Sequence, residues 1–292
     1  MVLSLVAVVA LLQVNAQETK LTVKMAKGDK YSMTSKSSVT SVSEFGGNEM
    51  KATVESSTGQ DIEVVDFADG KYTLSVTNKG NQVKANSPMG GDMELNTTTG
   101  AGFDQFPGGM PKFLKESAGL KYELVINEAG ALVSVKGLEK LAKPKEAEEG
   151  MIKMMLGGIA LNATDSAIIK ATLSVFAFCN KGSVKGGESW VINSGTPKTP
   201  TTQSFTATAA TPETLTIATK GTRKINNTMS MMGQDAEVTG DEAQTGTTEV
   251  AVKTGLISSA IINTSTKMTI NMGGNEIPST NTNKTTVAVV KM

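Results

Sequence analysis

The sequence predicts a mainly β protein: an antiparallel curved sheet or half-barrel built from two related halves, with a two-helix insert between them. Three observations support this fold class. Apolar and polar residues alternate in many short segments, Gly- and Asn-containing turns separate these segments, and the alternation stops between residues 138 and 180. Alternation with a period of two places apolar side chains on one face of a strand, and short turns favour antiparallel hairpins.

The clearest alternation lies at 72–77 and 121–126, where Tyr, Leu, Val and Ile alternate with Thr, Ser, Lys and Glu. The same pattern recurs at Leu21, Val23 and Met25, at Leu215 and Ile217, at Val250 and Val252, at Met268, Ile270 and Met272, and at Val287 and Val289. Turn signals such as Asp69-Gly70 and Gly273-Gly274-Asn275 separate the segments. We therefore expect an antiparallel sheet with one face in water.

The insert at residues 138–180 shows helical spacing instead. Apolar residues recur three and four apart within 152–159 and again within 168–176, which predicts two helices. Thr164 or Asp165 is the expected N-cap of the second helix. Gly157-Gly158 and Asn162 mark the break between the two.

The insert divides the chain into a signal peptide at 1–16, a first β-rich half at 17–137, the helical insert at 138–180 and a second β-rich half at 181–292. Both halves open on a charged glycine turn followed by an aromatic residue, and Thr73–Gly80 resembles Thr214–Gly221 later in each half. These matches, in the same order, predict a duplicated β unit.

The amino terminus predicts export. Val2–Leu12 is an uncharged apolar run with the length of a signal-peptide h-region, and the small-residue pattern ending at Ala16 predicts cleavage there. No other stretch approaches the ~20 apolar residues of a transmembrane helix. No cysteine follows the run, so we expect no lipid anchor. The expected location of the mature chain is periplasmic or extracellular, with a buried amino-terminal strand as the alternative interpretation of the apolar run.

Composition argues against several classes of site. The chain has no histidine, which excludes Ser-His and Cys-His nucleophile pairs and histidine-bound zinc. One cysteine, Cys179, cannot form an internal disulfide or a thiolate-clustered metal site. The 28 basic residues balance the 28 acidic ones, so nothing attracts nucleic acid over a long range. We expect no cofactor, no nucleic-acid partner and no enzymatic activity.

Several short segments resemble one family of proteins. Residues 176–190 and 27–31 look like an uncharacterised family, a domain of unknown function, of exported Bacteroidetes proteins, and 126–138 and 254–259 are similar to hairpins of that family. The chain departs from its pattern at Glu188, where Asp is favoured, and at Asn180-Lys181, where a proline is usual. The resemblance implies a fold and an envelope compartment, and it carries no site residues because the family has no established activity.

Two sets of side chains are candidates for chemistry. Asp61 and Glu63 lie two apart in a predicted strand and share a face, which is the minimum geometry for paired carboxylates, although alternating acids also form the wet side of a sheet. Met229, Met231 and Met232 offer thioethers, soft ligands that select Cu(I), whereas methionine also fills irregular apolar space. The sequence leaves both pairs of interpretations open, and packing and solvation are the favoured ones.

The favoured function is an exported, non-catalytic β protein that binds an apolar ligand or an envelope component, in a cavity beside a curved sheet. The alternatives are a structural or adhesion module of the cell envelope, a Met-based Cu(I)-binding protein and, least favoured, a carboxylate- or lysine-based enzyme. A half-closed sheet with an accessible interior favours the binding protein, and a flat, filled sandwich favours the module.

Overall fold

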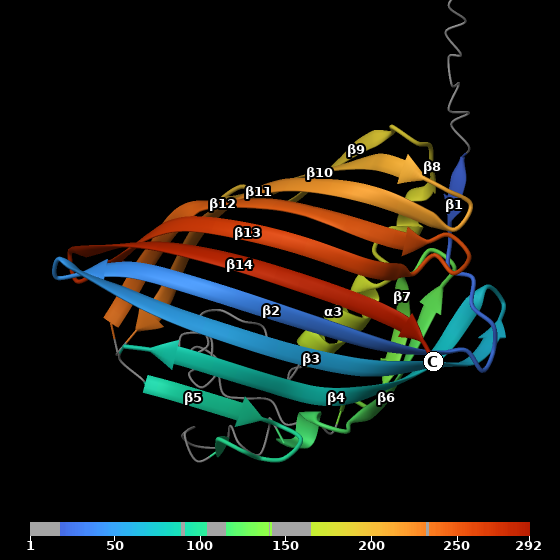
Figure 1. Cartoon of the computed structure of the whole chain (residues 1–292), viewed down its shortest axis with the longest axis horizontal. Coiled ribbons are helices and arrows are strands. Elements are labelled where there is room, and N and C mark those ends of the chain that lie inside the picture. The colour runs from blue at the N-terminus through green and yellow to red at the C-terminus, as the bar shows by residue number, and fades with distance from the viewer. Residues whose placement is uncertain (1–17, 89–90, 104–114, 140, 142–164, 232–233) are drawn as a thin grey trace, which may run out of the picture.

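The structure is a computed structural model that describes residues 18–88, 91–103, 115–139, 141, 165–231 and 234–292. Its main feature is a 12-stranded antiparallel sheet whose long strands curve together over one side of the molecule (Figure 1). A second, two-stranded sheet pairs β1 with β8. The predicted fold class, an antiparallel curved sheet, is confirmed.

The strands of the first half are mostly long hairpin arms. Their bounds are β1 (Thr19–Leu21), β2 (Lys30–Phe45), β3 (Asn48–Ala68), β4 (Lys71–Ser87), β5 (Gly91–Asn96), β6 (Lys121–Asn127) and β7 (Leu132–Lys136). The expected amino-terminal strand through Met25 is shorter than predicted, because β1 ends at Leu21. Val23 and Met25 nevertheless point into the core, and the Val23 amide donates to the Glu128 carbonyl oxygen at 2.8 Å.

The second half continues in the same style. Its elements are α3 (Asp165–Ser174), the short 3-10 helix η2 (Cys179–Lys181), β8 (Gly182–Val184), β9 (Ser189–Thr196), β10 (Thr199–Ala210), β11 (Thr214–Met231), β12 (Gln234–Ala251), β13 (Ile257–Met272) and β14 (Asn275–Lys291). The second predicted helix is confirmed as α3, which begins at Asp165. The first predicted helix, at 152–159, lies outside the described residues.

The order of strands keeps the two halves of the sequence apart within one sheet. It runs β7-β6-β4-β3-β2 and then β14-β13-β12-β11-β10-β9, with β5 paired to β4. The halves meet where β2 pairs with β14, from Tyr31–Lys291 to Ser43–Ser279. We call this pairing the seam. The order is compatible with the predicted division into two β-rich halves, and the duplication itself stays a prediction.

A polar cluster holds the turn before β2 against the end of β14. The Asp29 carboxylate accepts hydrogen bonds from the Ala26 amide at 2.9 Å and from the Tyr31 hydroxyl at 3.1 Å. Lys291 Nζ lies 2.6 Å from the other carboxylate oxygen. The hydrogen bond from Lys291, then that from Ala26, lowers the pKa of Asp29.

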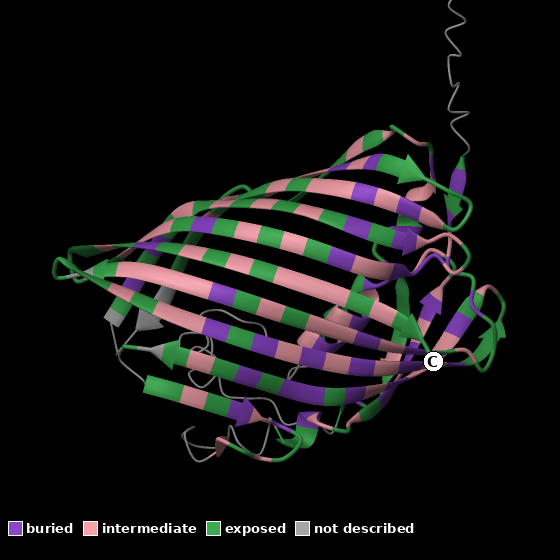
Figure 2. Ribbon diagram, viewed as in Figure 1, coloured by how far each residue is buried: buried purple, intermediate pink, exposed green. Residues whose placement is uncertain are grey.

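The hydrophobic core lies on the face of the large sheet that α3 packs against, which we call the inner face. Burial alternates along the long strands, as Figure 2 shows, because successive side chains point to opposite faces. One cluster joins α3 to strands of the first half through residues such as Leu74, Leu124 and Ile168. A second cluster, which includes Phe205 and Leu215, lies under the second half.

A buried hydrogen-bond network fixes α3 to the sheet. The Thr172 hydroxyl, on α3, donates to Gln60 Oε1 at 2.9 Å and lies 2.6 Å from the Tyr122 hydroxyl. Gln60 Nε2 donates to that hydroxyl at 3.1 Å and to the Ile168 carbonyl oxygen at 3.3 Å. Gln60 and Thr172 are completely buried. Burial raises the pKa of Tyr122, so its phenol is neutral and serves as a structural donor and acceptor.

Candidate functional site

The inner face changes from apolar to polar along the strands of the second half. On β11, Leu215 and Ile217 are completely buried, whereas the later inner-face positions include Gly221 and Arg223. On β12, Val250 is buried at the same end and Glu242 lies farther along the same face. The apolar end belongs to the core beside α3, and the polar stretch lies beyond it.

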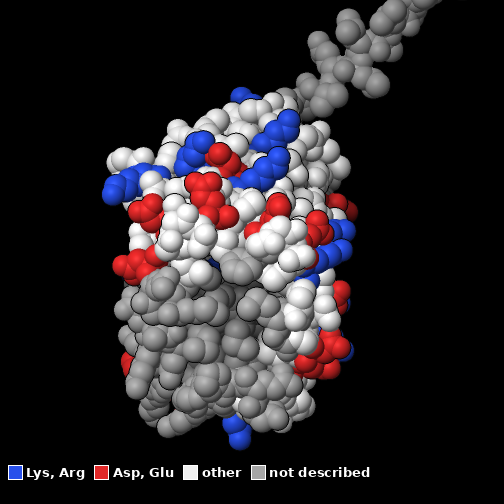
Figure 3. Space-filling model, turned by 90° about the vertical axis from the view of Figure 1, so that its left-hand side faces the viewer, with Lys and Arg blue, Asp and Glu red and all other residues white. Residues whose placement is uncertain are grey.

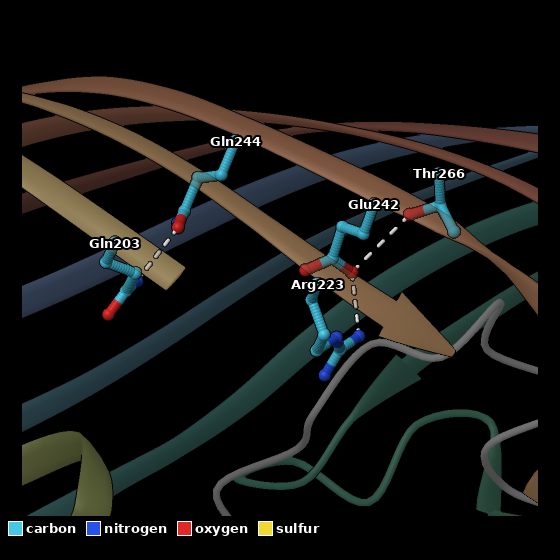
Figure 4. Close-up of polar contacts among 5 residues, drawn as sticks. All are labelled: Gln203, Arg223, Glu242, Gln244 and Thr266. Carbon is cyan, nitrogen blue, oxygen red and sulfur yellow. Dashed lines mark hydrogen bonds and ion pairs between the residues drawn. The ribbon is translucent and has the colours of Figure 1, made fainter. Parts of the chain in front are cut away.

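An ion pair and a hydroxyl lie side by side in this polar stretch (Figure 4). Strand register places Arg223 of β11 opposite Glu242 of β12, and Glu242 opposite Thr266 of β13. Arg223 Nη2 donates to Glu242 Oε2 at 2.7 Å, and Thr266 Oγ1 donates to the same oxygen at 3.5 Å. The charges of the pair compensate each other, so this cluster presents donors and acceptors without a net charge.

A pair of amides continues the polar stretch toward β10. Gln203 Nε2 of β10 donates to Gln244 Oε1 of β12 at 3.1 Å, across the intervening strand β11 (Figure 4). Gly221 of β11 is the partner of both residues in the register. A Cβ at Gly221 would lie 3.3 Å from atoms of both glutamine side chains, so the absence of a side chain there lets the two amides meet.

Small polar side chains extend the inner-face polar surface to the seam. Ser37 and Ser41 of β2 donate to the Asn283 and Asn281 side-chain oxygens of β14, each at 2.6 Å. The Ser43 and Ser279 hydroxyls lie 2.9 Å apart. We call the combined surface the polar band; its members are Gln203, Arg223, Glu242, Gln244, Thr266, Ser37, Ser41, Ser43, Ser279, Asn281 and Asn283.

Solvent reaches part of the polar band. The Arg223 side chain keeps 49% of its surface exposed and that of Glu242 keeps 22%, although both lie on the face that carries the core. At the α3 end, by contrast, the inner-face side chains are buried. The inner face is therefore buried at the α3 end, partly exposed around Arg223 and Glu242, and buried again at Val238 and Ala236 of β12.

Aromatic rings border the band at the β9 edge. Phe205 follows Gln203 on the same face of β10, and its ring stacks on Trp190 of β9 with centroids 5.4 Å apart. Phe178 packs edge-on against both rings. Lys181 Nζ lies 5.5 Å from the centre of the Trp190 ring. An apolar ring surface thus adjoins the glutamine pair.

The outer face carries a different, charged groove of about 1110 Å³. Lys224 and Asp241 line it, and their charged atoms lie 2.6 Å apart on side chains that are more than half exposed. Lys224 directly follows Arg223, and Asp241 directly precedes Glu242. Because side chains alternate along a strand, Lys224 and Asp241 point to the opposite face. Figure 3 shows the end of the molecule where the β2–β3 hairpin lies, with Lys and Arg interspersed among Asp and Glu. The described residues at that end therefore form no surface of a single charge sign.

Each carboxylate of the predicted pair forms its own ion pair. Asp61 and Glu63 share a face of β3, as expected, but each carboxylate has its own lysine. Lys79 Nζ lies 2.8 Å from Asp61, and Lys30 Nζ lies 3.4 Å from Glu63. This arrangement is that of a solvated sheet face with cross-strand ion pairs.

The methionine candidates cannot be placed as a site. Met232 lies outside the described residues, and so do the side chains of Met229 and Met231, whose backbone belongs to β11. A Cu(I) site at these three residues stays a prediction. Cys179 is buried, its thiol donates to the Gly255 carbonyl oxygen at 3.2 Å, and burial raises its pKa to about 11, which makes it a structural side chain.

Sequence reasoning missed the residues of the polar band. Arg223 and Glu242 are 19 positions apart, and only the hairpin register that pairs Met231 with Gln234 brings them together. The local signal in the sequence is the spacing of Glu242 and Gln244, which are two positions apart and therefore share a face of a strand.

Comparisons with known proteins give a family and little else. A family model described as "Family of unknown function (DUF6263)" matches residues 69–257. No curated protein matches the chain. Among the described residues, α3 and η2 are both too short to span a bilayer as helices.

The chain is also similar to solved structures at low identity. One is the COG4313 outer membrane channel from Pseudomonas putida F1, with 8% identity, 92% of this chain and 97% of that chain covered, and a TM-score of 0.26. Another is the β domain of the Bordetella autotransporter BrkA, with 8% identity, coverage of 90% and 99%, and a TM-score of 0.20. A third is OccAB4 of Acinetobacter baumannii, with 7% identity, coverage of 91% and 99%, and a TM-score of 0.22. Likeness at this level supports no functional conclusion.

Proposed function

The chain belongs to DUF6263, a family of unknown function, and from that premise we propose that it is a non-catalytic envelope protein that binds a neutral carbohydrate on its polar band. The observation that carries the proposal is the partly exposed set of amide, guanidinium, carboxylate and hydroxyl groups on the inner face. The signal peptide predicted at 1–16 supports an envelope location. A Bacteroidetes origin stays an inference from the sequence motifs.

The chemistry of the band suits hydroxyl groups. A sugar hydroxyl both donates and accepts, and the amides of Gln203 and Gln244 can do the same, each with donors and an acceptor. Arg223 and Glu242 neutralise each other, so a charged ligand gains little there. Trp190 and Phe205 form a stacked aromatic pair at the edge of the band, beside which a sugar ring can pack.

The apolar ligand expected from the sequence is less well supported. At the α3 end, apolar side chains of the inner face such as Leu74, Leu215 and Ile217 are buried in the protein's own core. Farther along the strands, Ile225 and Met268 are partly exposed and belong to neither core cluster. The part of the inner face that solvent reaches at Arg223 and Glu242 is polar. An envelope component with exposed hydroxyls fits that surface better than an acyl chain does.

A binding experiment with matched variants tests the proposal. Wild-type protein is mixed separately with neutral oligosaccharides and with a lipid extract, and complexes are detected by native mass spectrometry and saturation-transfer NMR. We expect oligosaccharide complexes that weaken at least tenfold in the Gln203→Ala/Gln244→Ala variant, since a few lost hydrogen bonds of ~1 kcal/mol each have that effect. Gln82→Ala, an exposed glutamine on the outer face of β4, is the control and should bind as wild type.

Three outcomes would contradict the proposal. The protein could form complexes only with lipid, which would restore the apolar-ligand interpretation. It could bind no oligosaccharide at all, which would favour a structural or adhesion module. Oligosaccharide binding that survives in Gln203→Ala/Gln244→Ala would place the site elsewhere. Copper titration of a Met229→Leu/Met231→Leu/Met232→Leu variant tests the metal alternative, which unchanged Cu(I) affinity would remove.

A further inference from the structure

Strand β9 forms one edge of the large sheet, and most of its residues are exposed. It pairs with β10 and with no other described strand. Seven of its eight residues are exposed, and the exposed fraction reaches 57% at Val191 and 43% at Ile192. An open edge of this kind is a template for pairing with another strand.

The edge lacks two of the usual devices that prevent pairing, charge and proline. The segment Ser189–Thr196 contains no charged residue and no proline. The opposite edge, β7, is shorter, carries Lys136 and has a register irregularity against β6 at Val125–Ile126. Charges and bulges of this sort block edge-to-edge association. The two edges therefore differ in how readily they accept a strand.

The register shows which main-chain groups of β9 are available. Gly195 lies opposite Pro200, which has no amide hydrogen, so this pair cannot exchange two hydrogen bonds. Bonded and non-bonded pairs alternate along an antiparallel ladder. The amides and carbonyls of Ser189, Val191, Asn193 and Gly195 consequently point away from β10, toward the open edge.

We propose that β9 is a self-association surface, on which a second copy of this chain adds its own β9 in antiparallel orientation. A two-fold axis through Ile192 puts Val191 of one copy opposite Asn193 of the other. The same axis puts Ser189 opposite Gly195. The outward-pointing amides and carbonyls of the two edges then bond each other. The same axis places the two Ile192 side chains face to face on the inner side and brings the two Val191 side chains into diagonal contact on the outer side.

A second copy fits this edge for two reasons. The edge has no charge, so two identical edges meet without repulsion. The two exposed apolar residues, Val191 and Ile192, are neighbours beside the centre of the strand, so one symmetric contact covers both. A symmetric pairing of identical patches is also the commonest form of protein association. The result is a continuous sheet across two molecules.

Cross-linking tests the pairing directly. At the centre of the dimer the two Ile192 residues form a non-hydrogen-bonded pair with Cα atoms about 4.5 Å apart, which is within disulfide range. We expect Ile192→Cys to form a disulfide-linked dimer under mild oxidation. Val290→Cys, which is more exposed than Ile192 (62% against 43%) but lies on β14 between β2 and β13, is the control and should stay uncross-linked. The native Cys179 is buried and should not take part.

Sedimentation equilibrium over a concentration series supplies the second measurement. Wild type and Val290→Lys should approach twice the monomer mass, whereas Val191→Lys should stay monomeric with an unchanged circular dichroism spectrum. A wild type that is monomeric throughout, or an Ile192→Cys protein that cross-links no faster than Val290→Cys, overturns the proposal. A monomer that instead protects its β9 amides on addition of an unrelated extended peptide also overturns it, in favour of peptide capture.

Discussion

The buried network between α3 and the sheet makes a quantitative prediction. Thr172→Val keeps the branched shape of the side chain and removes its hydroxyl, which leaves Gln60 Oε1 without the donor at 2.9 Å. Gln60 and Thr172 are fully buried, so water cannot replace the bond. A buried polar group left unpaired costs ~1–3 kcal/mol. We expect a loss of about 2 kcal/mol, or a melting temperature lower by roughly 4 °C.

Matched variants separate the hydrogen bond from packing. Thr172→Ser keeps the hydroxyl and should lose less stability than Thr172→Val, in both thermal and urea unfolding. The triple variant Thr172→Val/Tyr122→Phe/Gln60→Met removes the network as a whole and should recover part of the loss, because no side-chain polar group then stays unpaired. If Thr172→Val unfolded at the same temperature and denaturant concentration as Thr172→Ser, the network would contribute nothing to holding α3.

Three further predictions concern single positions. Gly240→Ala should lose ~1–3 kcal/mol in urea unfolding, because its Cβ would lie 2.3 Å from the Lys267 carbonyl oxygen; Gly186→Ala, with a nearest contact of 4.0 Å, should unfold as wild type. Asp29→Asn should be less stable than wild type at neutral pH. The difference in stability should vanish as the pH falls below 3.8 and through the lowered pKa of Asp29 in the folded protein. A difference that persisted at such low pH would contradict the stabilising role of the Asp29 carboxylate. Cys179 should resist thiol reagents at pH 8 until denaturant is added, since its thiol is buried with a pKa of about 11, and fast native labelling would contradict that.

The sequence predicted the strands where apolar residues occupy the inner face and missed them where polar residues do. Alternation at 72–77 locates the first part of β4, whereas the strand continues to Ser87. Beyond Val76 the inner-face positions include Asn78 and Asn81, both buried, so polar residues stand on the face where alternation predicts apolar ones. The period-two signal fades there although the backbone stays extended.

The candidate site was harder to predict for a related reason. Its polar contacts join neighbouring strands, and Ser37 and Asn283, which bond across the seam, are 246 positions apart. No spacing rule within a strand identifies such pairs. The absence of histidine limits which chemistry the site can carry, but which polar side chains meet depends on the register of each hairpin.

The seam also bears on how the molecule folds. Closing a flexible loop of the length between Ser37 and Asn283 costs about 5 kcal/mol of chain entropy, and the two meander halves each form from nearest-neighbour hairpins at much lower cost. Contacts this remote in the chain slow folding. Each half can therefore form first, and the pairing of β2 with β14 forms later. Until it forms, β2 and β14 are open edges that a chaperone would have to shield.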